Sequence, residues 1–234
     1  MHPFNLAVIV PTLNEAGNIP SLLRCLNDMR GVTEIVIADG GSHDATAQLA
    51  HDGGATVVTA PRNRGAQLNA GARAARGDVL WFLHADARPH PGSALAIRQA
   101  LALPRVLGGN FRLRFDAAGL APRVFETIAR LQRYGGVYYG DSSLFMRRAV
   151  FEALGGYRAW PLFEDYDLAR RLERHARRAG SRTVCLPLPI IVSARRFRDR
   201  PLHTLVLWMA LQTLFALGVS PQRLAQIYHR VSQG

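Results

Sequence analysis

The sequence predicts an α/β fold built on a doubly wound, mainly parallel sheet. Two observations support this prediction. Roughly the first hundred residues alternate apolar runs with segments of helical spacing, and the apolar runs contain no polar alternation. Uninterrupted apolar runs are typical of strands that are buried on both faces, as in a parallel sheet. Crossover connections between such strands leave their carboxyl ends at one edge of the sheet.

The elements of the first half follow from local patterns. Between Asn18 and Met29, for example, the residues Ile19, Leu22 and Leu26 recur at helical spacing. The expected strands are Leu6–Val10, Glu34–Ala38, Ala55–Thr59 and Val79–Leu83. The expected helices are 18–29, 44–51, 67–75 and 89–101.

After residue 104 the pattern changes. Gly109–Phe115 alternates apolar and polar residues, which predicts a half-exposed strand. We expect a helix or long loop at 121–133, a short strand at 144–146, a short helix at 150–154 and a helix at 164–179. Two prolines, Pro187 and Pro189, interrupt Thr183–Ile191, so this segment is expected to be an edge strand and loop.

Composition limits the class of protein. The chain has 234 residues, of which 48% are hydrophobic, enough for one large α/β domain or two halves sharing a sheet. Cys25 and Cys185 lie far apart and are too few for a disulfide framework, so we expect reduced thiols in a cytoplasmic protein. The apolar run Leu6–Val10 is too short for the core of a signal peptide.

The charge of the chain points to anionic partners. The formal net charge is +12, and every basic residue is Arg. The absence of Lys excludes Schiff-base chemistry and P-loop lysines. An excess of Arg favours phosphorylated substrates, anionic lipid or nucleic acid. No zinc-finger or RNP motif is present, so no nucleic-acid partner is expected.

Three of the predicted strands end in polar residues. These are Thr12 and Glu15, Asp39 and Ser42, and His84 and Asp86. Ligands of open α/β sheets bind outside the carboxyl ends of the strands, so these residues predict a site. Asp86 offers hard oxygen ligands, which suit Mg²⁺ or Mn²⁺ holding a diphosphate. The alternative is that Asp86 caps the helix expected at 89–101.

The motifs at these strand ends resemble those of a known family. GxGxxG and GxxxxGK[ST] are absent after the first strand, which argues against NAD enzymes and P-loop ATPases. The motifs present are PTLNE, ADGGSHD, NRGAQLNAGARAARGD, HADA, GDSSLFMRR and FEDYDL, between roughly Leu6 and Arg200. They resemble the family-2 inverting glycosyltransferases of GT-A fold, and most closely the bacterial subgroup named for arsenosugar biosynthesis.

The resemblance implies a donor site and a metal site. Pro11, Thr12 and Glu15 would line the nucleoside pocket, and Asp39 would hydrogen-bond the base, expected to be uracil. Residues expected near the donor diphosphate or sugar are Arg62, Gly65, Gln67, Arg195 and Arg196. Asp86 would bind a divalent cation, Mn²⁺ or Mg²⁺. His84 stands where the family usually has the first acid of a D-x-D pair; it is a tolerable ligand for Mn²⁺ and a poor one for Mg²⁺. The alternative for His84 is a hydrogen-bonding role at the strand end.

The resemblance also implies a catalytic base. Glu164, Asp165 and Asp167 open the helix expected at 164–179. Acids in a first turn are stabilised by the helix dipole, and this alone would explain them. The same position keeps a carboxylate ionised, which suits a general base. By resemblance Asp165 is the base, with Glu164 as the second candidate. Asp141 and Glu164 would lie on the acceptor side, and Asp167 would cap the helix or face solvent.

The C-terminal segment is unusually apolar. Leu205–Leu211 has no polar face, so we expect it to be covered on all sides. The run Leu202–Val219 is too short and too often interrupted to span a membrane. It is covered either within the fold or by an outside contact, a homodimer partner or a peripheral contact with the inner face of a membrane. A last amphipathic helix is expected at 221–231.

Together these features predict an enzyme. Residues 1–200 would form the GT-A domain, with a nucleotide-sugar half (1–104) and an acceptor half (105–200), followed by a helical extension (201–234). The chain would transfer a sugar from a UDP-linked donor to a small-molecule or lipid-linked acceptor, with inversion and metal assistance. A nucleotidyltransferase would need a GxGTR-like loop and a Lys, and both are missing. A non-catalytic nucleotide-sugar-binding or membrane-scaffold protein would fit His84 but would not need both Asp86 and Asp165.

Overall fold

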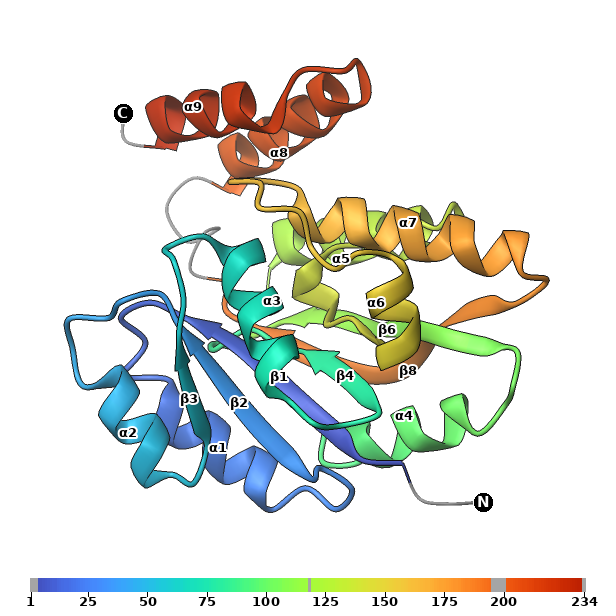
Figure 1. Ribbon diagram of the computed structural model, residues 1–234. Coiled ribbons are helices and arrows are strands. Elements are labelled where there is room, and N and C mark those ends of the chain that lie inside the picture. The colour runs from blue at the N-terminus through green and yellow to red at the C-terminus, as the bar shows by residue number, and fades with distance from the viewer. Residues whose placement is uncertain (1–3, 118, 195–200, 233–234) are drawn as a thin grey trace.

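The protein is built on one mixed sheet of eight strands, in the order β3-β2-β1-β4-β7-β6-β8-β5 (Figure 1). The computed structural model describes residues 4–117, 119–194 and 201–232. The strands are β1 (Leu6–Thr12), β2 (Glu34–Asp39), β3 (Thr56–Thr59), β4 (Val79–Phe82), β5 (Arg88–Pro89), β6 (Val106–Phe115), β7 (Phe145–Arg147) and β8 (Arg182–Val192). Four of the seven strand pairings are parallel, so the predicted doubly wound, mainly parallel α/β fold is confirmed.

Helices cover both faces of this sheet (Figure 1). They are α1 (Ile19–Asn27), α2 (Thr46–Asp52), α3 (Arg64–Ala74), α4 (Ser93–Leu101), α5 (Leu120–Tyr134), α6 (Arg148–Ala153), α7 (Glu164–Arg178), α8 (Pro201–Ala216) and α9 (Pro221–Ser232), with a 3₁₀ turn, η1 (Gly140–Ser142). One hydrophobic cluster joins α1, α2 and α4 to the sheet, and a second joins α3, α6 and α7 to its other face. Between these clusters β1, β2 and β4 are buried on both sides, as the uninterrupted run Leu6–Val10 predicted for β1.

The two halves of the chain meet where β7 pairs with β4 in antiparallel fashion. β6 then pairs antiparallel with β7, and β8 returns parallel to β6. The predicted edge strand at 183–191 is therefore a full strand, with β6 on one side and the short β5 on the other. It accommodates Pro187 by a register shift, because Leu186 pairs with Phe111 and Pro189 with the next residue, Arg112.

Two predicted helix starts were wrong. The helix expected to start at residue 67 begins at Arg64, because the Asn63 side chain accepts a hydrogen bond from the Ala66 amide and caps it. The helix expected at 89–101 begins only at Ser93, because Arg88 and Pro89 pair with β8. Its N-cap is Gly92. Asp86 therefore does not cap this helix.

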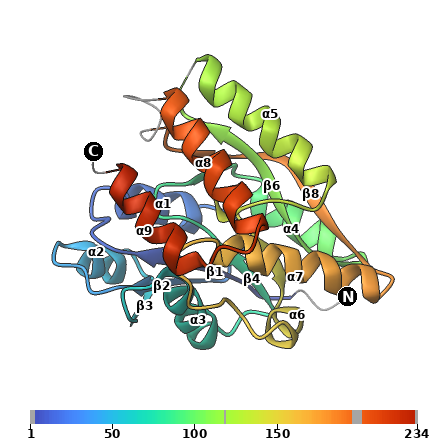
Figure 2. The same cartoon turned by 90° about the horizontal axis from the view of Figure 1, so that it is seen from above.

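α8 and α9 form a hairpin above the sheet layers, and α8 crosses close to α5 (Figure 2). Leu211 of α8 is fully buried with Phe163 and Leu224. Val206 and Met209 are 66% and 53% exposed, so this fold by itself does not cover the helix on all sides, and its cover by an outside contact stays a prediction. Within the described ranges, no helix combines the length and apolar character needed to cross a membrane.

Candidate active site

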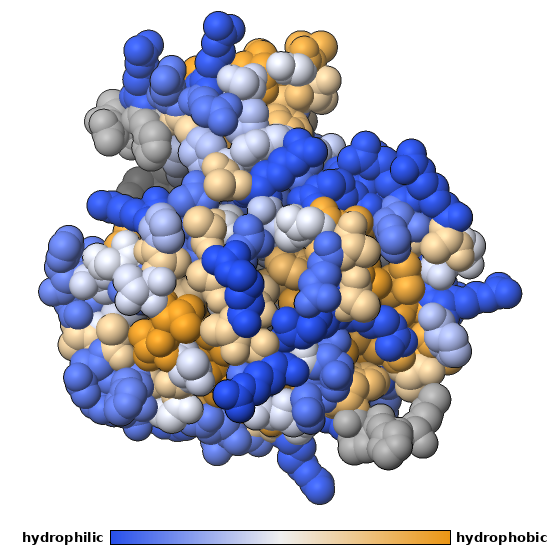
Figure 3. Space-filling view, in the orientation of Figure 1, coloured by the Kyte–Doolittle hydropathy of each residue, from blue (hydrophilic) through white to orange (hydrophobic). Residues whose placement is uncertain are grey.

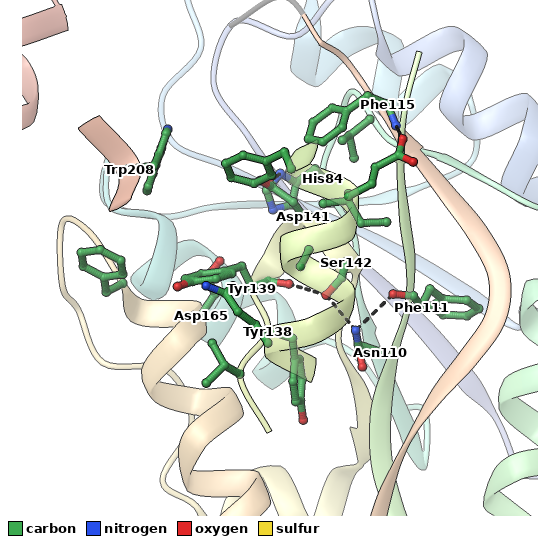
Figure 4. Close-up of a pocket in the computed structure, with 18 of the residues that line it drawn as sticks. His84, Asn110, Phe111, Phe115, Tyr138, Tyr139, Asp141, Ser142, Asp165 and Trp208 are labelled. Carbon is green, nitrogen blue, oxygen red and sulfur yellow. Dashed lines mark hydrogen bonds and ion pairs between the residues drawn. The ribbon is translucent and has the colours of Figure 1, made fainter. Parts of the chain in front are cut away.

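Two of the three strand ends predicted to converge, those of β1 and β4, line one cavity of about 470 Å³, whereas Asp39 and Ser42 at the end of β2 are not part of its lining. Part of its polar lining comes from β1 and the loop after it, α3, the segment after β4, η1 and the first turn of α7. The predicted site residues in this lining are Pro11, Thr12, Glu15, Gln67, His84, Asp86, Asp141, Glu164 and Asp165. Figure 4 shows Asp165 on one side of the view and Phe115 on the other, with His84 and Asp141 between them. The structure thus brings together residues of both halves of the chain.

Arg64, which the motif comparison did not single out, lies at the centre of the polar lining. Its Nε is 3.2 Å from Glu164 Oε1, and its Nη2 is 3.6 Å from Asp165 Oδ2. Burial opposes the charge of Arg64, but the carboxylates of Glu164, Asp165 and Asp141 outweigh burial and raise its pKa. Arg64 therefore remains a cation that holds together acids from two segments of the chain.

Arg64 also determines the state of His84. Its Nη2 contacts His84 Nε2, and because a guanidinium only donates, Nε2 accepts. The proton of the neutral imidazole is then on Nδ1, which lies 3.3 Å from Asp141 Oδ1. His84 thus fits the predicted alternative of a hydrogen-bonding strand-end histidine. Its Nε2 could bind a metal ion only if Arg64 moved away.

The two adjacent acids of α7 differ in environment. Burial, together with the neighbouring charge of Asp165, raises the pKa of Glu164 to about 7, although Arg64 lowers it. Asp165 accepts hydrogen bonds from two backbone amides, Gly140 N at 2.5 Å and Tyr166 N at 2.7 Å. These two bonds fix the position of the Asp165 side chain at the start of α7.

Gly140 makes this arrangement possible. A Cβ at this position would lie 2.5 Å from Arg64 Nη2 and 2.7 Å from Asp165 Oδ2. Arg64 and Asp165 belong to the ion-pair cluster that Arg64 forms with Glu164 and Asp165, so any side chain at position 140 would push this cluster apart. The motif GDSS contains this glycine, but the sequence does not indicate which distant side chains it meets.

One of the two predicted alternatives for Asp167 was that it faces solvent, and the structure contradicts this alternative. Asp167 is 9% exposed, and its Oδ2 accepts from Arg171 Nε at 2.7 Å and lies 3.5 Å from Arg158 Nε. Arg171 also donates to the carbonyls of Leu154 and Gly156. Arg171 therefore fastens the loop before α7 to the helix.

Asp39 and Gln67 connect the ends of β1 and β2. Asp39 accepts four hydrogen bonds, from Thr12 Oγ1 and from the backbone and side-chain donors of Gly41 and Ser42. Burial alone would raise the pKa of Asp39, but these bonds together lower it. The Gln67 amide donates to the carbonyls of Thr12 and Ala38. These contacts are structural, and the contact of Asp39 with a base stays a prediction.

The remaining predicted donor residues lie elsewhere. Gly65 faces the loop before α7, where a Cβ would lie 2.2 Å from the Arg158 carbonyl oxygen. Arg62 is exposed and is not part of the cavity lining. Arg195 and Arg196 lie outside the described residues. Their predicted contacts with a diphosphate remain untested.

A divalent cation would find few protein ligands here. In the described part of the chain, no group of three or more His, Cys, Asp and Glu side chains is arranged to hold a metal ion. Asp86 is half-buried in the cavity wall and offers hard oxygen ligands. This donor set fits Mg²⁺ or Mn²⁺ if the other ligands come from a diphosphate and water.

Comparison with known proteins gives the family. The family described as glycosyl transferase family 2 matches residues 7–155, more than half of the chain. The chain belongs to this family. The match includes the motifs at the ends of β1, β2 and β4 together with Arg64 and Gly140. It ends before α7, so it does not include Glu164 or Asp165.

Two curated relatives of this family 2 chain share a name, undecaprenyl-phosphate 4-deoxy-4-formamido-L-arabinose transferase. The protein of Aeromonas hydrophila is 31% identical over 165 residues, which cover 64% of this chain and 51% of the relative. That of Pseudomonas fluorescens is 36% identical over 107 residues, covering 39% and 31%. The chain thus spans about a third to a half of the length of these relatives.

Solved structures show the same fold. The mannosyltransferase PcManGT from Pyrobaculum calidifontis, in complex with GDP-Man and Mn²⁺, has a TM-score of 0.66 at 20% identity. The match covers 98% of this chain and 69% of that one. Glucosyl-3-phosphoglycerate synthase from Mycobacterium tuberculosis, with Mn²⁺, UDP and glucosyl-3-phosphoglycerate, has a TM-score of 0.59 at 20% identity and covers 87% and 75%. These likenesses confirm the GT-A fold of this family 2 chain.

Proposed function

We propose that this family 2 protein transfers a sugar from a nucleotide-diphosphate sugar, with UDP as the nucleotide, to an acceptor hydroxyl with inversion at the anomeric carbon. The observation that carries the proposal is the acidic pair Glu164–Asp165, held by Arg64 in the same cavity as the ends of β1 and β4. A carboxylate of this pair would act as the base beside the edge of the sheet where nucleotides bind in open α/β folds.

The donor would lie along the strand ends. Pro11, Thr12 and Glu15 are available to the nucleoside at the end of β1. Asp86 would hold a divalent cation on the diphosphate, and the relatives solved with Mn²⁺ support this cofactor. Bound there, the cation would neutralise charge on the leaving diphosphate.

Asp165 would act as the base on the acceptor. It would take the proton of the acceptor hydroxyl while that oxygen attacks the anomeric carbon from the face opposite the diphosphate. The bond from this carbon to the diphosphate oxygen breaks, and the nucleoside diphosphate leaves with the electron pair. Glu164, whose raised pKa leaves it partly protonated near neutral pH, is the second candidate for this role.

The experiment is donor binding and turnover in matched variants. Asp165→Asn should bind UDP in the presence of Mn²⁺ within a few-fold of the parent, yet lower kcat by roughly 10²–10⁴, the usual contribution of a positioned base. If Glu164→Gln is inactive and Asp165→Asn is not, Glu164 is the base. NMR of the product reports its anomeric configuration, and retention of configuration would contradict the proposed inversion.

The alternative is a binding protein without catalysis. His84 in place of an acid favours it. A protein that binds UDP-sugars tightly but shows neither transfer nor slow donor hydrolysis over hours would support this alternative. The retained acids Asp86, Glu164 and Asp165 argue against it, because a binding site has no need of a base.

The chemical class of the acceptor and the place in the cell where the protein works are also proposals. The resemblance to the arsenosugar-biosynthesis subgroup rests on the motifs alone, and it leaves a small-molecule acceptor open. The relatives named for undecaprenyl phosphate favour a lipid-linked acceptor. With such an acceptor the protein would work at the inner face of a membrane, and the exposed residues of α8 would meet the bilayer or a second copy of the chain.

A further inference from the structure

The cavity has a second wall that the proposed chemistry does not use. Residues of α5, α8 and the loop before α7 contribute mainly apolar side chains to this wall, and Figure 4 shows one of them, Trp208. Those that matter most here are Phe125, Ile128, Leu162, Phe163, Trp208 and Met209. A nucleotide or a free sugar has little apolar surface to cover such a wall. The wall therefore fits another part of the reacting pair.

This wall lies between two helices that are distant in sequence. α5 and α8 lie side by side in Figure 2, and Gln132 Nε2 donates to Gln212 Oε1 at 3.1 Å across the gap. We refer to the space between them, lined by Phe125, Ile128, Trp208 and Met209, as the α5–α8 groove. The groove is continuous with the acids, because its residues and Asp165 line the same cavity.

The apolar surface continues from the groove to the outside. Met209 is 53% exposed while it lines the cavity, and Leu131 of α5 is 61% exposed. Figure 3 shows further hydrophobic side chains where α8 leads into α9, at which point Leu217 is 76% exposed. A long apolar ligand could therefore enter the groove with one end still outside the protein.

The charged residues beside the groove favour an anionic ligand. Arg112 and Arg130 are exposed and both line the cavity. Glu126, an acid of α5 in the same lining, is already paired with Arg114 at 3.0 Å and accepts a hydrogen bond from the Phe115 amide at 2.9 Å. The cavity lining thus combines apolar surface with the exposed positive charges of Arg112 and Arg130.

We infer that the α5–α8 groove binds the apolar chain of the acceptor, which is an amphiphile with an anionic head group. This inference rests on the proposed function, because it assigns the acceptor side of that same site. The apolar chain of the acceptor lies between α5 and α8, and its head group lies inward, toward Asp165. A second copy of the chain on this face would not need the groove to open into the reaction cavity.

The test uses dodecyl phosphate as the probe, below its micelle concentration, and ethyl phosphate as the short-chain control. Binding is followed by the fluorescence of Trp208, with Trp208→Phe to identify its signal. We expect saturable binding of dodecyl phosphate and no comparable binding of ethyl phosphate. Equal binding of the two would overturn the inference in favour of a small polar acceptor.

Matched variants on α8 test where the apolar chain of the ligand binds. Met209 and Val206 are both exposed residues of this helix, but only Met209 lines the cavity. Met209→Glu should weaken dodecyl phosphate binding by roughly 10–100-fold, as expected for a lost apolar contact. Val206→Glu should change it less than about twofold. Equal losses of dodecyl phosphate binding in both variants would mean that the ligand binds the outer face of the α8–α9 hairpin, as in docking to a membrane surface. This result would overturn the inference.

Two further measurements separate the remaining outcomes. Sedimentation at the same concentrations shows whether a second copy covers the groove; a dimer that Met209→Glu dissociates, with no probe binding, contradicts the inference. UDP binding in Mn²⁺ is measured on the same variants and should be unchanged. If UDP does not bind the parent protein while dodecyl phosphate does, the proposed function has failed and the apolar-chain site remains.

Discussion

Glu164 gives the sharpest prediction about this protein, because its carboxyl is buried beside both a cation and another acid. The side chain is 5% exposed, with Arg64 at 3.2 Å and Asp165 as its neighbour in the chain. The pKa of Glu164 is about 7, compared with 4.5 for an unperturbed Glu. Burial and the charge of Asp165 therefore destabilise the ionised form of Glu164 more than Arg64 stabilises it. Glu164→Gln removes this ionisation and keeps the size of the side chain.

The size and sign of the effect follow from linkage. Between pH 4.5 and about 7 the unfolded chain has lost the Glu164 proton while the folded protein retains it, so stability falls as the pH rises. The gap between the two pKa values corresponds to about 3 kcal/mol above pH 7. We expect Glu164→Gln to be more stable than the parent by about 3 kcal/mol near pH 8, and by under about 1 kcal/mol near pH 5.

The assay is urea unfolding of parent and variant at both pH values, with EDTA present so that no cation binds the folded state. Glu152→Gln is the matched control, because Glu152 is 64% exposed and only pairs loosely with Arg148 at 3.9 Å. The control should match the parent at both pH values, as is usual for exposed pairs. If Glu164→Gln is less stable than the parent near pH 8, Arg64 outweighs burial and the argument is wrong.

Three other substitutions test the site. Gly140→Ala should fold but lower kcat by roughly tenfold or more, because the new Cβ would lie 2.7 Å from Asp165 Oδ2; normal turnover would show that the cluster can shift without loss. Asp86→Ala should weaken UDP binding in Mn²⁺ and leave metal-free binding unchanged, as calorimetry with and without EDTA can measure. Asp39→Asn should lower the free energy of unfolding at neutral pH by about 1–3 kcal/mol, since the carboxylate accepts four hydrogen bonds. Because hydrogen bonds lower the pKa of Asp39, the loss should shrink as the pH falls through that pKa; a loss that is constant with pH would contradict this origin.

Local patterns determined much of the architecture. The run Leu6–Val10 had to be a strand buried on both faces, because five successive apolar residues leave no side for water. Once the first four strands are parallel, their carboxyl ends share an edge, which explains why Thr12 and His84 line one cavity. The inner stripe of α7, with Leu168, Leu172 and Ala176 buried, follows in the same way from helical spacing.

Only the tertiary structure decided which side chains meet. Arg64 lies one residue from the predicted Gly65, yet its guanidinium pairs with acids a hundred residues further along the chain. No local pattern encodes such a contact, since it depends on how β7 inserts antiparallel beside β4 and brings Gly140 against α3. The same holds for α8, whose uniform apolar sequence does not say which residues are covered. Leu211 is buried and Met209 is exposed because α8 contacts α5, α9 and the loop before α7 on one side only.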